Sequence, residues 1–285
     1  MDKNVLIVEE KYSKLISILQ DMGKVVVAFS GGVDSTFLTY AAKQAVGERA
    51  LAVTSRSGVV PQRDLVEGAA FCVQQGIAHA YVDFDELAVP GFAENPPDRC
   101  YICKKTLFTK LLEVAKDKKA VLCEGSNMDD LGDYRPGLRA LRELSVRSPL
   151  QEAGLTKAEI RLLSQKFGLP TWAKPASACL ASRFAYGERI TATKMAAVDK
   201  AEQLLFDLGF TQYRVRAHGD EKKGLLARIE VLPEDLAKAL QPECRQEIIT
   251  KFKDFGFTYI TLDLIGYRTG SMNEVLRVAG AKERA

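Results

Sequence analysis

Short apolar runs alternate with amphipathic stretches along the first 170 residues of the chain. Each run has the length of a strand, and the stretch after it repeats its apolar residues at helical spacing. The runs are residues 25–29, 51–54, 80–84 and 121–123. Strands separated by helices of this length form parallel sheets that are covered on both faces. The pattern therefore predicts an α/β domain with a parallel, doubly wound sheet over residues 1–175.

A further helix and an irregular segment follow these alternating elements. Thr156 and Glu159 have the spacing of a capping box, and Gly168 followed by Pro170 predicts the end of that helix. Residues 171–187 sustain no period. We interpret this segment as a linker that also contributes to a functional site.

The C-terminal part, residues 176–285, is expected to form a smaller α+β domain. Residues 195–208 are amphipathic, whereas residues 213–216 and 226–231 alternate between apolar and polar side chains and predict a pair of strands. Two more helices and one more strand are expected at residues 233–240, 248–255 and 259–264. This part is too short for a second doubly wound domain.

Composition and charge narrow the class of protein. The chain is 47% hydrophobic and 27% charged, and its net charge of +3 is too close to zero to indicate a broad nucleic-acid-binding surface. No apolar run approaches the roughly 20 residues that cross a bilayer, and the N-terminal residues lack a signal-peptide cleavage site. We therefore expect a cytoplasmic protein, in which clustered cysteines indicate metal binding or catalysis rather than disulfides.

The most specific motif lies between a predicted strand and a predicted helix. It consists of Ser30, Gly31, Gly32, Val33, Asp34 and Ser35. Glycines allow the backbone to approach an oxyanion, to which the N–H groups at a helix start then point. Ser30 and Ser35 add hydroxyl donors, and Asp34 beside a phosphate implies a bridging Mg²⁺. A plain glycine turn is the alternative, but the full hexapeptide in this context is more specific. The motif is neither a Walker A loop nor a dinucleotide fingerprint.

The six cysteines fall into two groups. Three of them stand alone and are expected to be small core residues: Cys72, Cys123 and Cys244. Cys100 and Cys103 form a CxxC motif at the start of a predicted helix, where the helix dipole and neighbouring Arg and Lys residues favour thiolates.

The CxxC motif has three interpretations. A thioredoxin-like redox pair would need a different pattern of elements around it, and a zinc site would need two more ligands from a chain with only two histidines. The third interpretation adds Cys179, because three thiolates can hold a [4Fe–4S] cluster that leaves one iron open to hydrosulfide. Inert thiols or zinc remain the alternatives, since spacing does not separate metals.

The glycine-pair motif resembles the pyrophosphatase loop of the ATP-pyrophosphatase (PP-loop) family, whose fold is adenine nucleotide α-hydrolase-like. The resemblance implies that ATP is cleaved between its α- and β-phosphates and that AMP is transferred to a substrate oxygen, from which a nucleophile displaces it. It makes the Mg²⁺-binding Asp34 part of the catalytic machinery. It also adds Ala28 and Gly125 to the expected ATP site.

Further blocks extend the resemblance, from about Ser13 to about Asn273, to the LarE family. They are DYRPGL (133–138), KPASACLASRFAYG (174–187), RVR (214–216) and TLDL (261–264). Enzymes of this family adenylate the carboxylates of pyridinium-3,5-biscarboxylic acid mononucleotide and replace an oxygen of each with sulfur, for the nickel-pincer nucleotide of lactate racemase. The same resemblance places Arg135 close to the nucleotide.

One branch of the LarE family sacrifices a single cysteine, and another has three cysteines and resembles cluster-dependent tRNA-thiolating enzymes. In ungapped register with residues 182–183, the sacrificial position falls on Ala178, one residue before Cys179. The pair Cys100 and Cys103 has no counterpart in the sacrificial branch. Both departures favour a catalytic [4Fe–4S] cluster held by these three cysteines.

Basic residues of the C-terminal domain are candidates for the substrate phosphate. Arg214 and Arg216 lie two residues apart on a predicted strand and so face the same side, and a guanidinium binds phosphate bidentately. A solvated strand face with a cross-strand partner such as Glu230 is the alternative. The resemblance to the LarE family assigns the substrate phosphate to Ser182, Arg183, Arg214 and Arg216.

These observations lead us to expect an enzyme that uses ATP, Mg²⁺ and a [4Fe–4S] cluster to transfer sulfur to a mononucleotide carboxylate. A sulfide or other sulfur-donor system is its expected partner, and the resemblance implies a homo-oligomer. Transfer RNA thiolation is the nearest alternative, although the net charge of +3 gives it little support. Amide formation, as in NAD or GMP synthetases, would require no metal-binding cysteines, and a non-catalytic nucleotide or iron–sulfur carrier would release no pyrophosphate.

Overall fold

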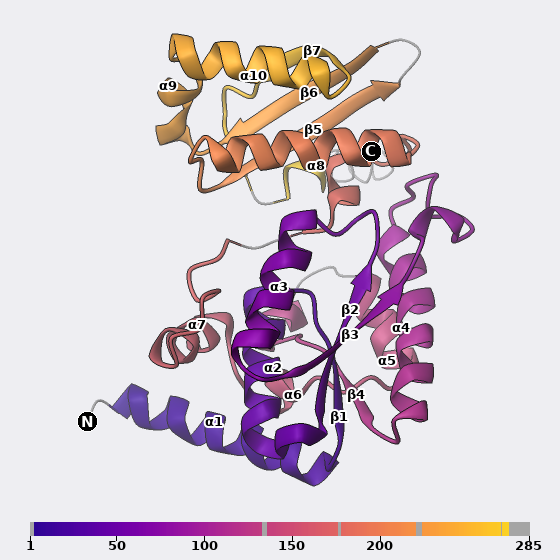
Figure 1. The fold of residues 1–285 in the computed structure, drawn as a ribbon, viewed down its shortest axis with the longest axis vertical. Coiled ribbons are helices and arrows are strands. Elements are labelled where there is room, and N and C mark those ends of the chain that lie inside the picture. Colours follow the sequence, from indigo (N-terminus) through magenta and orange to yellow (C-terminus); the bar gives the residue numbers. More distant parts are fainter. Residues whose placement is uncertain (1–2, 133–135, 176–177, 221–223, 269, 274–285) are drawn as a thin grey trace, which may run out of the picture. The chain divides into compact units, whose positions relative to one another are not determined.

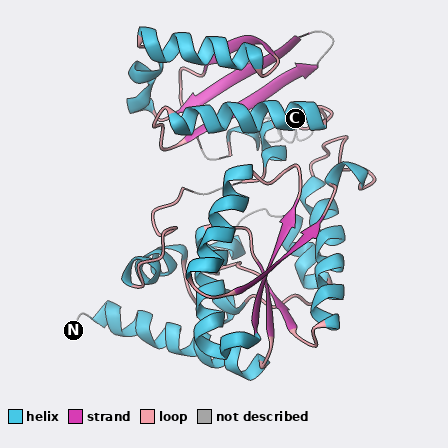
Figure 2. Ribbon diagram, in the orientation of Figure 1, coloured by secondary structure: helices cyan, strands magenta, loops and turns pink. Residues whose placement is uncertain are grey.

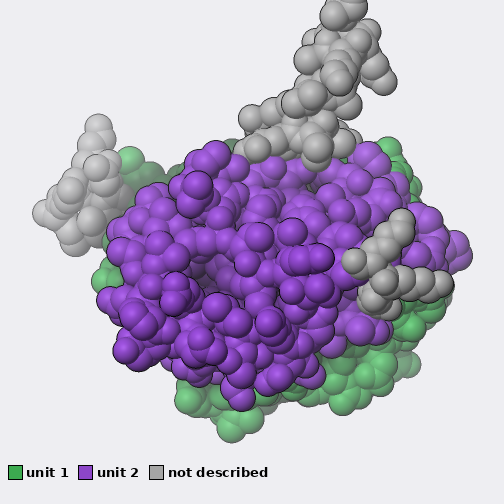
Figure 3. All heavy atoms as spheres, turned by 90° about the horizontal axis from the view of Figure 1, so that it is seen from above, with its two compact units in different colours: residues 1–89, 98–177 green, residues 90–97, 178–285 purple. Residues whose placement is uncertain are grey.

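The computed structural model describes residues 3–132, 136–175, 178–220, 224–268 and 270–273. The chain divides into two compact units, which Figure 3 colours separately. Unit 1 contains Met1–Val89 and Asp98–Ser177, and unit 2 contains Pro90–Pro97 and Ala178–Ala285. The sequence predicts one boundary, after residue 175, whereas the chain passes between the units three times because residues 90–97 belong to unit 2.

Unit 1 is built on a four-stranded sheet in which every neighbouring pair is parallel (Figure 2). The strands are β1 (Val25–Ala28), β2 (Ala50–Arg56), β3 (Ala78–Asp83) and β4 (Val121–Cys123). Each strand covers most of a run that the sequence marked. The predicted parallel α/β sheet is therefore confirmed.

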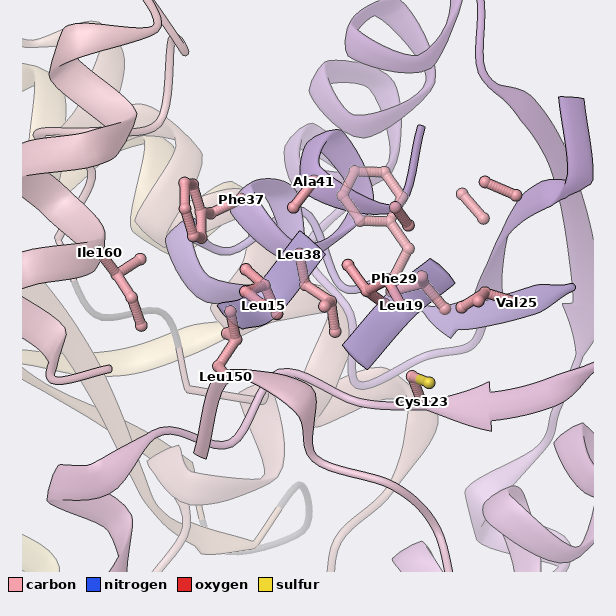
Figure 4. Close-up of a cluster of buried hydrophobic side chains, with 14 of the residues drawn as sticks. Leu15, Leu19, Val25, Phe29, Phe37, Leu38, Ala41, Cys123, Leu150 and Ile160 are labelled. Carbon is pink, nitrogen blue, oxygen red and sulfur yellow. The ribbon is translucent and has the colours of Figure 1, made fainter. Parts of the chain in front are cut away.

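Helices cover both faces of this sheet (Figure 1). They are α1 (Lys3–Met22), α2 (Val33–Val46), α3 (Gln62–Gln74), α4 (Arg99–Asp117), α5 (Pro136–Glu143), α6 (Pro149–Glu152) and α7 (Lys157–Lys166). Because strand residues alternate between faces, Val25 and Val27 pack with α1, α2 and α7, in the cluster that Figure 4 shows. Val26 packs on the other face, with α4 and α5. The buried faces thus hold unit 1 together as a doubly wound domain.

The strand order β3-β2-β1-β4 places a topological switch point between β1 and β4. From β1 the chain first adds β2 and β3 on one side and then crosses back to place β4 on the other. Open α/β sheets bind ligands beyond the carboxyl ends of the strands at such a point. The segments after β1 and after β4 are therefore where a ligand is expected.

Unit 2 contains a three-stranded sheet of order β5-β6-β7. Strand β5 (Tyr213–Asp220) is antiparallel to β6 (Gly224–Val231), and β7 (Phe257–Leu262) is parallel to β6. Its helices are α8 (Ala192–Asp207), α9 (Leu236–Ala239) and α10 (Pro242–Asp254). The predicted second, smaller sheet domain is confirmed. None of the helices in the described ranges combines the length and apolar character that crossing a membrane requires.

Hydrogen bonds from the backbone and from one side chain hold the inserted residues 90–97 to the rest of unit 2. Asn95 is fully buried, and its backbone has a φ of 55°. Its side-chain amide donates to the carbonyl of Ala185 at 2.6 Å, and its own carbonyl accepts from the N–H of Gly187 at 2.9 Å. The N–H of Ile190 donates to the carbonyl of Ala93 at 2.8 Å. This short strip is therefore an integral part of unit 2.

Candidate active site

The phosphate-loop motif, residues 30–35, connects β1 to α2 at the carboxyl edge of the sheet. Gly31 has a φ of 71°, and a Cβ added to it would lie 3.1 Å from the carbonyl oxygen of Asp64. Both the conformation and the space therefore require glycine. Gly32 is the N-cap residue of α2 and supplies no capping side chain. The N–H groups of the first helical turn are thereby left available to an anion.

Two serine hydroxyls close the loop. Ser35 Oγ donates to the carbonyl of Gly32 at 3.1 Å and lies 3.0 Å from Ser30 Oγ. Because a hydroxyl has one proton, Ser30 is the donor in the contact between the two serines. Rotation of either hydroxyl would direct its proton to a bound phosphate, so the loop can exchange internal hydrogen bonds for ligand contacts.

The segment after β4 meets the phosphate loop at the switch point. A Cβ added to Gly125 would lie 3.0 Å from the backbone nitrogen of Ser35 and 3.3 Å from Cβ of Asp34, so a side chain there would displace the loop. Asn127 Nδ2 donates to Asp34 Oδ1 at 3.3 Å. Ala28 is the last residue of β1, two residues before the loop. The structure thus brings the sequence-predicted ATP-site residues of unit 1 together, except Arg135, which lies outside the described residues.

Asp34 also forms an ion pair with Lys157, the first residue of α7. The predicted capping box of Thr156 and Glu159 starts this helix, and the backbone N–H of Lys157 donates to Asp129 Oδ2 at 2.9 Å. Lys157 was not among the predicted site residues, although the capping box at Thr156 places it at the start of a helix. Mg²⁺ in nucleotide sites commonly takes one or two carboxylates together with phosphate oxygens. The single carboxylate of Asp34 fits that ion in the presence of a nucleotide.

Lys174, near the start of the irregular segment, contacts residues next to the loop. Its ammonium group lies 2.9 Å from Asp64 Oδ1 and 2.7 Å from Glu67 Oε2, and it donates to the carbonyl of Gly31 at 3.3 Å. The sequence marked Lys174 only as part of a motif block. Its contacts connect the segment that leads out of unit 1 to the phosphate loop.

The cysteines have different surroundings. Cys72 and Cys123 are fully buried in the core of unit 1, as predicted, and burial raises the pKa of their thiols to about 11 and about 12. Cys123 is labelled in Figure 4. Cys244 differs from the prediction, because it is only half-buried on α10.

The three cysteines assigned to a cluster form no disulfide, and they are divided between the two units. Cys100 and Cys103 lie half-buried in the first turns of α4, one helical turn apart, and belong to unit 1. Cys179 is exposed and belongs to unit 2. The two neighbouring thiols on one helix fit the donor chemistry of a metal–thiolate centre. Within the described residues, no group of three or more His, Cys, Asp or Glu side chains is arranged to hold a metal ion.

The sheet of unit 2 has one apolar face and one charged face. Directly opposite residues of β5 and β6 share a face, and these pairs include Arg214 with Glu230 and Arg216 with Arg228. Arg216 Nε and Nη2 donate to Glu230 Oε2 at 3.0 and 2.8 Å, and Arg228 Nη1 donates to Glu230 Oε1 at 2.9 Å. Glu230 therefore does have an arginine partner, but the pair is buried rather than solvated.

The C-terminal segment covers this charged face. Ser271 Oγ donates to Glu230 Oε1 at 3.0 Å and accepts from Arg216 Nη2 at 3.1 Å. The guanidinium of Arg214 lies over the ring of Tyr267, 5.3 Å from its centroid. Burial lowers the pKa of Arg214, and the neighbouring guanidinium of Arg183 lowers it further. A bound anion would relieve that repulsion.

Arg183 and Glu202 form a second buried ion pair in unit 2, at 2.8 Å. Burial raises the pKa of Glu202, but the charge and hydrogen bonds of Arg183 outweigh burial and hold that pKa below its usual range. Ser182 Oγ accepts from Arg183 Nη1 at 2.7 Å. The predicted substrate-phosphate residues of unit 2 are thus found around one buried cluster of charges.

Comparisons with known proteins agree with this geometry. Residues 8–94 match the NAD synthase family. The chain is 42% identical over 270 residues to an uncharacterized protein of Synechocystis sp., covering 94% of this chain and 98% of that protein. It is 35% identical over 271 residues to the pyridinium-3,5-bisthiocarboxylic acid mononucleotide synthase of Lactiplantibacillus plantarum, covering 94% and 96%. It is 31% identical over 200 residues to the tRNA-specific 2-thiouridylase of Microcystis aeruginosa, covering 58% and 56%.

Proposed function

Because the chain belongs to the LarE family, that of the pyridinium-3,5-bisthiocarboxylic acid mononucleotide synthases, we propose that it thiolates a carboxylate of a pyridinium biscarboxylic acid mononucleotide. The protein is an ATP-dependent sulfurtransferase with a PP-loop. The observation that carries the proposal is the 35% identity along 96% of that synthase. The proposed product serves synthesis of a nickel-pincer nucleotide cofactor.

In the proposed first step, a carboxylate oxygen of the substrate attacks the α-phosphorus of ATP. The bond from that phosphorus to the bridging oxygen breaks, and pyrophosphate leaves with the electron pair. The loop from Ser30 to Ser35 holds the leaving pyrophosphate through backbone N–H groups and hydroxyls. Lys157, which is paired with Asp34 without a ligand, turns to the phosphates, and Asp34 then binds Mg²⁺.

The proposed substrate-phosphate subsite is the charged face of unit 2. It centres on Arg214 and Arg216, and Ser182 is a neutral donor because its oxygen, not its proton, is used by Arg183. Guanidinium groups outnumber carboxylates on this face among the described residues, which include Arg183, Glu202, Arg214, Arg216, Arg228, Glu230 and Asp263. The excess positive charge suits a phosphate dianion.

For the sulfur, we propose a [4Fe–4S] cluster held by Cys100, Cys103 and Cys179. Such a cluster, when bound, would supply the sulfide that attacks the activated carbonyl carbon, whose bond to the adenylate oxygen breaks so that AMP leaves with the electron pair. The two thiols on α4 support the proposal, because they lie one helical turn apart on the same helix and cysteine sulfurs are the ligands of such clusters. An external sulfide or sulfur-donor system would restore the sulfur, and we expect the enzyme to work as a homo-oligomer in the cytoplasm.

The test is anaerobic purification followed by reaction with ATP, Mg²⁺, sulfide and the pyridinium biscarboxylic acid mononucleotide. Pyrophosphate release and a thiocarboxylate product in the mass spectrum are expected, with iron, acid-labile sulfide and an EPR signal in the protein. The Asp34→Asn variant is the control and should release little pyrophosphate. A colourless, iron-free protein that still forms product would refute the cluster, and a protein that releases no pyrophosphate would refute the enzyme.

Thiolation of tRNA is the second candidate function. It is supported by the 31% identity over 200 residues to a tRNA-specific 2-thiouridylase. Binding to tRNA that weakens steeply with salt, together with tRNA-dependent pyrophosphate release, would favour it over the mononucleotide reaction.

A further inference from the structure

The guanidinium of Arg183 is buried, and most of its N–H groups donate hydrogen bonds to other residues of unit 2. It is 2% exposed, and its Nε and Nη2 each donate to Glu202 at 2.8 Å. Its Nη1 donates to the carbonyl of Ala178 at 2.9 Å and to Ser182 Oγ at 2.7 Å, and the carbonyl of Cys179 lies 3.4 Å from the same nitrogen. The acceptors of Arg183 are therefore a buried carboxylate and the turn that contains Cys179.

These contacts leave little of Arg183 for a ligand. A guanidinium has five N–H groups, and one on Nε, one on Nη2 and both on Nη1 have acceptors in the structure. Bidentate binding of a phosphate needs two neighbouring N–H groups. Arg183 could provide two such groups only by breaking its hydrogen bonds to Glu202 or to the turn.

Glu202 is itself fixed from two sides. It lies on α8, and its Oε1 also accepts from the backbone N–H of Val215 on β5 at 2.9 Å. The turn has a second anchor on β5, because Arg216 Nη1 donates to the carbonyl of Ser182 at 3.1 Å. Two arginine side chains thus hold the backbone of residues 178–182. Arg183 connects it to Glu202 on α8, and Arg216 connects it to β5.

We infer that Arg183 is a positioning residue: held by Glu202, it fixes the carbonyls of Ala178 and Cys179 and so sets the direction in which the Cys179 side chain leaves the turn. It is not a contact of the substrate phosphate. The role in sulfur transfer rests on the proposed function, whereas the role in ordering the turn does not.

The Glu202→Gln and Arg183→Lys variants of the full chain test this inference. Glu202→Gln keeps the shape and an acceptor for Val215 while it removes the charge that orients Arg183. Arg214→Lys is the matched control, since it changes a neighbouring arginine whose guanidinium donates to the carbonyl of Tyr213 and lies over the ring of Tyr267. Three quantities are measured: hydrogen exchange of peptides covering residues 178–184, the Kd for nicotinamide mononucleotide as a phosphate-bearing probe, and thiocarboxylate formed per pyrophosphate released.

The two test variants should speed hydrogen exchange in residues 178–184 by tenfold or more, change the Kd of the probe by less than twofold and lower the thiolation-to-pyrophosphate ratio. Arg214→Lys should do the reverse, with a Kd at least tenfold higher and unchanged exchange. The inference is overturned if Arg183→Lys weakens the probe as Arg214→Lys does and leaves exchange unchanged. If Arg183→Lys fails to fold, Glu202→Gln decides alone. A chain that thiolates nothing would refute the proposed function but leave the exchange and Kd results to decide the inference.

Discussion

The Glu230→Gln substitution should destabilise unit 2 by about 3 kcal/mol, because it neutralises one member of a buried ion pair. Glu230 is fully buried, and its two oxygens accept from Arg216, Arg228 and Ser271. A glutamine retains one acceptor oxygen, but its NH₂ group would face donors on the other side. The perturbation thus leaves the Arg216 guanidinium, 6% exposed, without its charge partner.

The free-energy cost depends on whether each donor to Glu230 keeps another acceptor after the substitution. Removing one partner from a buried pair costs about 3–5 kcal/mol. The lower end applies here because Arg228 keeps Asp263, and the hydroxyl of Ser271 can rotate away. A loss of 3 kcal/mol is roughly a hundredfold change in the opening equilibrium.

Hydrogen exchange of peptides from β5 and β6 in the full chain measures this change. The single tryptophan, Trp172, belongs to unit 1, so its fluorescence does not report directly on unit 2. The control is Glu48→Gln, which breaks an ion pair with Lys43 at a side chain that is 86% exposed and should cost less than about 1 kcal/mol. If exchange in β5 and β6 rises by less than threefold, the reasoning about a buried, charge-dependent sheet face is wrong.

Three further predictions concern other parts of the chain. Lys157→Gln should lower the rate of pyrophosphate release at least tenfold and raise the KM for ATP, whereas Lys166→Gln at the exposed end of the same helix should change neither by more than twofold. Because the pKa of Glu202 is lowered in the folded protein, its ionised form stabilises unit 2 fully above the usual glutamate pKa, and this stabilisation is lost as the pH falls through the lowered pKa. Glu202→Gln should therefore weaken the loss of unit 2 stability at acidic pH, as measured by hydrogen exchange. Because burial raises the pKa of Cys72 to about 11 and of Cys123 to about 12, iodoacetamide at pH 8 should leave both unmodified in the folded chain and modify both in urea, as peptide mass spectrometry would detect.

Local signals in the sequence were enough for the sheet of unit 1 and for the phosphate loop. Strand-length runs, the glycine pair and the capping box at Thr156 each depend on neighbouring residues, and each occurs where it was expected. The contact between Asp34 and Lys157 was not predicted, because it joins residues 123 positions apart that only the fold brings together.

The charged face of unit 2 shows the same limit. The strand pattern correctly placed Arg214 and Arg216 on one face, and the register does set Arg214 opposite Glu230. The hydrogen bonds to Glu230 nevertheless come from Arg216, which reaches diagonally, and from Ser271, which follows 41 residues later. Alternation predicts the face of a side chain but not its partner or its burial, which depend on the segment that folds over it.

The strip of residues 90–97 has a consequence for dissecting this protein. Cutting the gene after residue 177 would leave Asn95 in the N-terminal fragment. Asn95 would then lose its hydrogen bonds to the carbonyl of Ala185 and from the N–H of Gly187. The C-terminal fragment would in turn lack a piece of main chain that Ile190 requires. Neither fragment would therefore match a complete structural unit, and expression of the uncut polypeptide is needed to obtain unit 2 with residues 90–97 in place.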